Sequence, residues 1–174
     1  MKNKASRLAL CGVLAALALA VMFLGGVLPF AAIACPVLAS LILIPVYCEC
    51  GQRWGWCWYL AVSVLSLLLV SDPEVPLLFL FLGYYPMIKK YLGRLRALRW
   101  PAKLLYVNLA IAAAYAAMIY VFQLSAVIQE LKTTGALMLA LSLLLANVSF
   151  VLYDLLIARL EIFYFVRLRP KLKL

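Results

Sequence analysis

The chain has 174 residues, of which 69% are hydrophobic and 13% charged, and its mean hydropathy is +1.11. A soluble domain of this size cannot hide so much apolar surface, because such domains are nearer half apolar and a quarter charged. The composition therefore predicts one integral membrane domain over residues 1–174, and the formal charge of +10 indicates cytoplasmic loops and anionic lipid rather than nucleic acid.

Six apolar segments follow one another along the chain, and each predicts a membrane-spanning helix. Helices satisfy their own backbone hydrogen bonds in lipid, and the segments lack the alternation of a membrane barrel. The first segment continues too long for a signal peptide and is expected to be a retained helix. The last is too long for one crossing, so its end is expected to project into the cytosol or lie in the interface. The predicted spans are residues 8–28, 31–47, 54–70, 75–91, 102–123 and 135–166.

The basic residues fix the expected direction of these spans. With the N-terminus in the cytosol, the basic loop between the fourth and fifth spans and the basic tail both lie inside, and Lys132 is the exception on the outer side. This distribution follows the positive-inside rule. It predicts a multi-pass protein of the plasma membrane with both termini cytoplasmic.

The inner start of the third span is rich in cysteine and tryptophan. Trp54, Trp56 and Trp58 predict an interfacial aromatic belt. Cys48 and Cys50 stand two residues apart, but the chain has no histidine and no second close cysteine pair. No metal site or cofactor is predicted, and whether this pair holds a soft metal stays open.

The fourth span carries opposite charges at its two ends. Acids mark the expected outer mouth and lysines the cytosolic end, at Asp72, Glu74, Lys89 and Lys90. Pro86 is expected to kink the last turns of this span, because proline removes one backbone hydrogen bond. Gly83 gives local room, and Tyr84 and Tyr85 are expected at the inner interface.

Among the polar residues within the last two spans, three are expected to make contacts between helices. Asp154 lies about 28 Å along the sixth span from its outer end, at a rise of roughly 1.5 Å per residue. This depth is near the inner interface, where Asp154 is expected to pair with a basic residue, namely Lys89, Lys90 or Lys103. Asn108 and Asn147 are expected to tie helices together. These residues predict structural roles rather than a proton relay.

Motifs for enzymatic chemistry are missing from the sequence. It has no glycine-rich phosphate loop, no Ser/His/Asp set and no carboxylates with metal-ligand spacing. With six acids and no histidine, hydrolysis and phosphotransfer are not expected. The sequence therefore predicts a protein that is not an enzyme.

The first span contains small residues at four-residue spacing, which allow two helices to approach closely in lipid. One row holds Gly12, Ala16 and Ala20, and a neighbouring row holds Ala5 and Ala9. Internal packing and docking on another membrane subunit explain such rows equally well. Together with the six-span layout, the first helix (ALCGVLAALALA) and the segment FLGYYPMIKKYL resemble the S components of energy-coupling factor transporters.

This resemblance implies a substrate-capture subunit of a bacterial importer, which docks through these small residues on a membrane coupling protein driven by two cytosolic ATPases. It also implies an outward-facing pocket. The corresponding residues are Asp72, Glu74, Tyr120, Gln123, Gln129, Glu130 and Lys132. The implied ligand is a small molecule, vitamin-like or apolar, and this thin polar set favours an apolar ligand or none over a water-soluble vitamin.

A second resemblance gives an alternative function. D-type rod-shape-determining membrane proteins are similar in size and number of spans, and they imply a scaffold subunit with no transported solute. The basic fourth loop and tail would then contact an acidic partner or anionic lipid. An outward cavity lined by polar residues favours transport, whereas a lateral apolar groove favours scaffolding.

Overall fold

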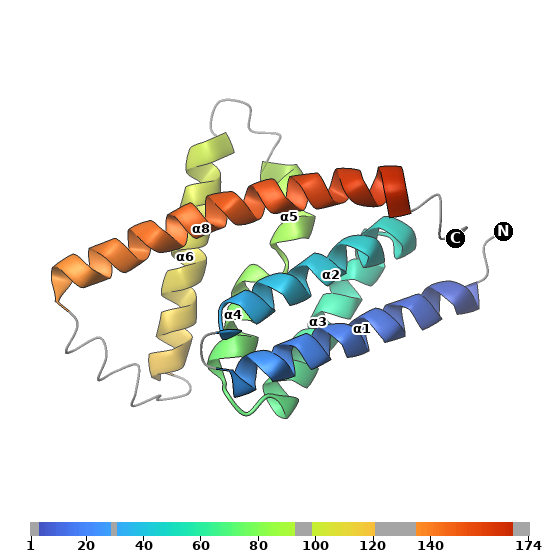
Figure 1. Cartoon of the computed structure of the whole chain (residues 1–174), viewed down its shortest axis with the longest axis horizontal. Helices are drawn as coiled ribbons and strands as arrows, with labels where there is room; N and C mark the ends of the chain where they lie inside the picture. The colour runs from blue at the N-terminus through green and yellow to red at the C-terminus, as the bar shows by residue number, and fades with distance from the viewer. Residues whose placement is uncertain (1–3, 29–30, 93–98, 121–134, 169–174) are drawn as a thin grey trace.

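The computed structural model describes residues 4–28, 31–92, 99–120 and 135–168, and the regular secondary structure in these ranges is helical (Figure 1). The predicted all-α class is therefore confirmed. The elements in chain order are α1 (Lys4–Val27), α2 (Ala34–Cys50), α3 (Gln52–Leu69), α4 (Glu74–Leu82), α5 (Tyr85–Leu92), α6 (Arg99–Tyr120), α8 (Ala136–Phe163) and the terminal π-helical turn η2 (Tyr164–Leu168).

Each predicted span coincides with helical structure. The boundaries of α1, α2, α3 and α8 differ from the predicted ones by a few residues, as expected for helix ends. The fifth predicted span corresponds to α6, and its last residues, 121–123, lie outside the described residues. The fourth predicted span is divided between α4 and α5.

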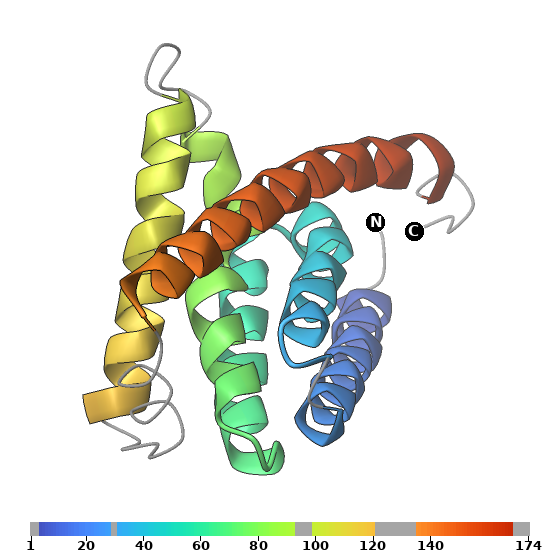
Figure 2. The same cartoon turned by 60° about the vertical axis from the view of Figure 1, so that its left-hand side comes forward.

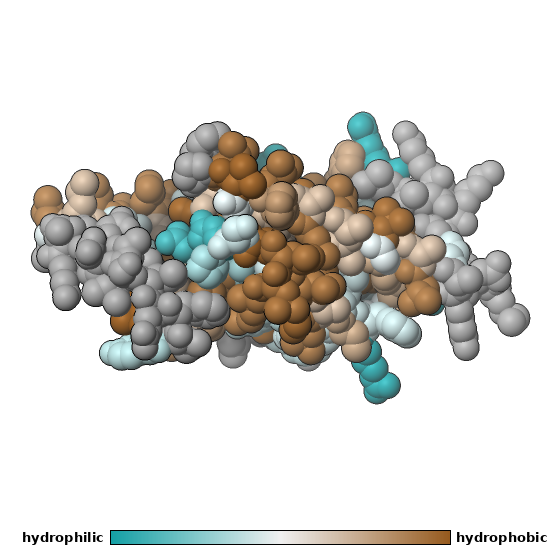
Figure 3. All heavy atoms as spheres, turned by 90° about the horizontal axis from the view of Figure 1, so that it is seen from below, coloured by the Kyte–Doolittle hydropathy of each residue, from teal (hydrophilic) through white to brown (hydrophobic). Residues whose placement is uncertain are grey.

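Three of the described helices are long and apolar enough to cross a membrane. They cover Ser6–Val27, Trp100–Tyr120 and Leu137–Arg167, and α2 is a shorter apolar helix. Large apolar side chains are exposed on all three, for example Val13 at 68%, Leu105 at 71% and Leu137 at 87%. Figure 3 shows apolar side chains over much of one face of the molecule. Such a surface fits a hydrocarbon solvent, so the protein is an integral membrane protein of the helical class.

The helices form a bundle that α8 crosses. α1 packs against α2 and α3, and α4 packs against α2 and α6. Figures 1 and 2 show α8 running across the bundle, over α6 and α2. The start of α1 and the end of η2 lie at the same end of the molecule in Figure 1.

The core lies between α1, α2, α3 and α4. Its most deeply buried side chains, with no exposed surface, include Ala18, Met22, Leu43, Val62 and Phe79. α8 contributes a narrower buried stripe. The stripe consists of Phe150, Tyr153, Asp154 and Ile157, whose spacing places them on one helix face. In contrast, each described side chain from Leu137 to Leu145 is exposed.

The fourth predicted span is interrupted at Gly83 and Tyr84, before the proline that was expected to kink it. Pro86 lies in the first turn of α5, where a helix does not need the missing N–H. A Cβ at Gly83 would lie 2.4 Å from the Phe79 carbonyl oxygen. The interruption thus falls in the turn that precedes Pro86, as expected for a proline kink, and the glycine at position 83 permits it.

Candidate functional site

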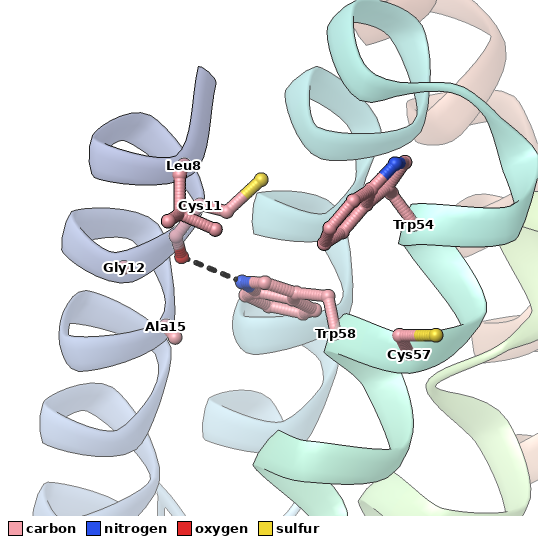
Figure 4. A pocket seen from close by; sticks show the side chains of 7 residues that line it. All are labelled: Leu8, Cys11, Gly12, Ala15, Trp54, Cys57 and Trp58. Atoms are coloured by element: carbon pink, nitrogen blue, oxygen red, sulfur yellow. Dashed lines mark hydrogen bonds between the residues drawn. The ribbon is translucent and has the colours of Figure 1, made fainter. Parts of the chain in front are cut away.

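An apolar groove lies between the first turns of α1 and α3 (Figure 4). Its volume is about 340 Å³. The lining residues are Leu8, Cys11, Gly12, Ala15, Trp54, Cys57 and Trp58. The groove lies beside Gly12 because glycine leaves open space there, and a Cβ at this position would meet no atom within 4 Å.

The two tryptophans of the groove have different roles. Trp58 is buried, and its indole N–H donates a hydrogen bond of 2.9 Å to the Cys11 carbonyl oxygen (Figure 4). Trp54 is 56% exposed. Trp58 therefore does not present its ring to the outside, because its polar N–H finds a partner on α1 inside the protein.

The row of small residues on α1 faces outward beside the groove. Gly12, Ala16 and Ala20 are exposed, and so is Ala9 of the neighbouring row. The side chain of Ala5 lies outside the described residues. The inward face of α1 is instead formed by residues such as Ala18 and Met22. This helix therefore presents an outward row of small side chains along which a second helix can approach.

A second polar feature is a buried ionic cluster centred on Asp154. Lys103 Nζ lies 2.7 Å from Asp154 Oδ2, and Lys89 Nζ lies 3.1 Å from Asp154 Oδ1. The Tyr85 hydroxyl donates a hydrogen bond of 2.6 Å to Oδ1. Lys89 also donates to the Asp154 backbone carbonyl. Asp154 therefore pairs with two of the three lysines named from the sequence, and it joins α5, α6 and α8.

This cluster is built to hold the helices together. A buried carboxylate is costly unless it is paired and hydrogen-bonded, and here three side-chain donors surround it. Tyr85 has no exposed surface, and its ring stacks on that of Tyr106 with 5.4 Å between centroids. Tyr85 is thus buried beside Asp154, because its hydroxyl and its ring both find partners in the core. Tyr84 is half-buried.

Further hydrogen bonds join α8 and its terminal turn to α2. The Ser40 and Tyr153 hydroxyl oxygens lie 2.6 Å apart, and the Tyr47 hydroxyl donates to Glu161. The Tyr164 hydroxyl donates to Glu49 at 3.2 Å. The polar contacts of α8 with α2 therefore run along the same face as the apolar stripe.

Asn108 and Asn147 form a reciprocal amide pair between α6 and α8. Each Nδ2 group lies 3.2 Å from the partner's Oδ1. Each Nδ2 group also donates to the carbonyl four residues earlier in its own helix. The pair thus links the two helices, as expected from the sequence.

The residues predicted to form an outward pocket are only partly described. Asp72 Oδ1 accepts a hydrogen bond of 3.1 Å from the Glu74 backbone N–H at the start of α4. Tyr120, at the end of α6, is 80% exposed. Gln123, Gln129, Glu130 and Lys132 lie outside the described residues. Asp72 thus has a local role in beginning a helix.

The close pair of thiols in the structure is not the Cys48 and Cys50 pair that stands out in the sequence. Cys50 Sγ lies 3.1 Å from Cys11 Sγ, so its close thiol neighbour is on α1. Among the described residues, no group of three or more His, Cys, Asp or Glu side chains is placed to hold a metal. The pairing of Cys11 with Cys50, like the groove, depends on how α1 packs against α2 and α3.

The groove was not predicted from the sequence, although the spacing of its lining residues is visible there. Leu8, Cys11 and Ala15 recur at helical spacing on α1, and Trp54, Cys57 and Trp58 do so on α3. Each set marks one helix face. The sequence alone does not show that the two faces meet.

The fold and these contacts define a helical integral membrane protein with an apolar groove on its side and a buried ionic cluster. No family model, curated protein or solved structure matches the chain.

Proposed function

We propose that the chain is the substrate-capture membrane subunit of an importer of the energy-coupling factor type, which docks through α1 on a membrane coupling protein. The observation that carries this proposal is the outward-facing row of Gly12, Ala16 and Ala20 beside an open groove. Lipid provides no hydrophobic drive for helix association, so close backbone approach must supply the contact. A glycine and two alanines allow that approach.

The groove supports the same role. A partner side chain can enter it between α1 and α3, where Trp54 offers an exposed aromatic surface. Aromatic residues at the edge of a pocket are common anchors in interfaces. The small-residue row and the groove are adjacent through Gly12, so one partner helix can use both.

The proposed topology has six spans. α2, α3 and the interrupted α4–α5 pair would cross beside the three long apolar helices, with both termini in the cytosol of a plasma-membrane protein. Two observations support it, namely the basic inner segments and the common end at which α1 begins and η2 finishes (Figure 1). An even number of crossings places both termini on one side.

The proposed substrate is a small molecule, vitamin-like or apolar, captured at the outer mouth. Asp72, Glu74 and Tyr120 would contribute to that mouth. The few charged and amide groups there suit a ligand with few polar groups. The protein itself would perform no covalent chemistry, and the ATPases of the partner complex would supply the energy.

A second candidate is a scaffold subunit without a transported solute, similar to D-type rod-shape-determining proteins. The lateral position and apolar lining of the groove favour it. In this role α1 would dock in the same way, and the basic segments would contact an acidic partner or anionic lipid. The two candidates therefore share the docking surface and differ in the partner and the ligand.

Both candidate functions can be tested by purification in mild detergent. Mass spectrometry then identifies the co-purifying proteins and small molecules. We expect a membrane coupling protein, an ATPase pair and a bound small molecule. A stable membrane complex without ATPases or ligand would instead establish the scaffold. Recovery of the chain alone from native membranes would contradict both candidates.

A further inference from the structure

Two thiols from separate helices meet at the start of α1. Cys11 lies about two turns into α1, and Cys50 is the last residue of α2. Their Sγ atoms are 3.1 Å apart, and both residues are half-buried. Cys50 Sγ also lies 3.8 Å from the Arg7 carbonyl oxygen. The two sulfur atoms are therefore in direct contact although 39 positions separate them in the sequence.

We propose that Cys11 and Cys50 form a thiol oxidation site, at which a peroxide converts the pair into a reversible disulfide. A disulfide requires an S–S distance of about 2.05 Å, so the sulfur atoms need to approach by only about 1 Å. Rotation of side chains at the exposed end of two helices can provide this movement. The inference concerns the state of the two thiols and does not rest on the proposed transport or scaffold function.

The chemistry needs no group beyond the two thiols and the peroxide. The Cys50 thiolate attacks one peroxide oxygen, the O–O bond breaks, and Cys50 becomes a sulfenic acid while the released hydroxide takes the thiol proton to form water. Cys11 sulfur then attacks the sulfenic sulfur. The S–S bond forms, the S–O bond breaks, and the departing hydroxide takes the Cys11 proton as a second water. Two thiols are oxidised and one peroxide is reduced.

The surroundings favour this pair over the other cysteines. Gly51, Gln52 and Arg53 follow Cys50 directly and are exposed, so a polar oxidant can reach the site. Cys35 is buried, and Cys48 packs against the core. Cys57 is exposed but lies on α3, across the groove from α1. Cys11 and Cys50 combine access with a neighbouring thiol, which are two of the properties of redox-sensing cysteines.

The disulfide would fasten the beginning of α1 to the end of α2. Cys11 also lines the groove, so oxidation would fix one wall of it. Thiols on the cytosolic side are normally kept reduced, and disulfides there are transient and responsive. The pair is therefore suited to sensing an oxidant at the membrane surface.

Peptide mapping of the full-length protein in detergent tests this site. The purified chain is treated with hydrogen peroxide, free thiols are alkylated, and chymotrypsin separates Cys11 from Cys50 by cutting after the aromatic residues between them. Cys48 remains in the same peptide as Cys50, so the mapping uses the Cys48→Ser protein. The matched controls are Cys48→Ser proteins that also carry Cys50→Ser or Cys57→Ser.

We expect a linked peptide pair that contains Cys11 and Cys50, with both thiols lost to alkylation and both recovered after reduction. The Cys57→Ser change should leave the linked pair in place, and the Cys50→Ser change should abolish it. Continued alkylation of Cys11 and Cys50 after peroxide treatment would overturn the proposal. A predominant link through Cys57 would overturn it as well.

Discussion

Lys103 Nζ lies 2.7 Å from Asp154 Oδ2, and each of these side chains is only 6% exposed. The contact joins α6 to α8, and Tyr85 and Lys89 add α5 to the same carboxylate. Apolar helices attract one another weakly in lipid, so a buried ion pair with several donors is a strong way to fix their arrangement. Asp154 is therefore expected to act as a structural joint.

Substitution of this joint should destabilise the protein. Asp154→Ala leaves the buried Lys103 and the half-buried Lys89 without their carboxylate, and breaking a buried pair typically costs about 3–5 kcal/mol. We expect lower expression and a lower melting temperature in detergent, measured by fluorescence-detected size-exclusion chromatography after heating. Arg159→Ala, which removes an exposed charge from the same helix, should change little. A stable Asp154→Ala protein with lost ligand or partner binding would show a functional role instead.

The Tyr85 hydroxyl should contribute to the stability of the protein separately from the Tyr85 ring. Tyr85→Phe keeps the stacking on Tyr106 but removes the donor to Asp154. Hydrogen bonds to charged groups contribute about 1.5–3 kcal/mol, so the melting temperature should fall by less than for Asp154→Ala. Tyr120→Phe removes an exposed hydroxyl and serves as the control. Equal melting temperatures for the two tyrosine variants would contradict this assignment.

The amide pair between α6 and α8 should show coupling in a double-mutant cycle. Asn108→Ala and Asn147→Ala each remove one side of the reciprocal hydrogen bonds. Interhelical hydrogen bonds in membranes contribute on average about 0.6 kcal/mol and at most about 2 kcal/mol. The double variant should therefore lose less stability than the two single losses combined. Strictly additive losses would mean that the amides do not depend on each other.

Enlarging the small-residue row should disturb docking without disturbing the fold. Gly12→Leu adds a side chain where no atom lies within 4 Å of the new Cβ, so the melting temperature should change little. The same side chain fills the groove and blocks close helix approach, and co-purification of the partner should fall severalfold. Val13→Leu, at a neighbouring exposed position, is the matched control. Undiminished recovery with Gly12→Leu or Ala16→Leu would sink the docking proposal.

The interruption between α4 and α5 should depend on glycine. Gly83→Ala places a methyl group against the Phe79 carbonyl and ring, where the contacts are 2.4 and 3.0 Å. Overpacking of this kind costs about 1–3 kcal/mol, and thermal unfolding should begin at a lower temperature. Gly135→Ala adds the same methyl group in open space and should have almost no effect. If both variants unfolded alike, the contact with Phe79 would be unimportant.

Local patterns in the sequence were sufficient to locate the helices. Long apolar runs and the charged segments between them indicate where each helix begins and ends, because these are properties of neighbouring residues. The pairing of Asp154 with lysines was also predictable, since the rise of a helix gives its depth. The prediction that Asn108 and Asn147 link helices followed from the free-energy cost of unpaired amides in lipid.

Features that depend on tertiary contacts were not predictable in the same way. The burial of Tyr85 depends on a carboxylate 69 positions away, and that of Trp58 on a carbonyl 47 positions away. Beside charged residues, both aromatics are typical of an interface. The groove and the contact of Cys11 with Cys50 likewise require the register of α1 against its neighbours, which no local pattern contains.

The unequal burial of α8 has a mechanical consequence. Its described polar contacts with other helices begin at Asn147 and continue toward the C-terminus, whereas each described side chain from Leu137 to Leu145 is exposed. The N-terminal part of α8, from Leu137 to Leu145, is thus held in place through the contacts of the C-terminal part of the helix. Leu137 lies about 25 Å along the helix from Asp154. A tilt of α8 by about 10° around Asp154 would move Leu137 sideways by about 4 Å, while the distances in the ion pair would change little.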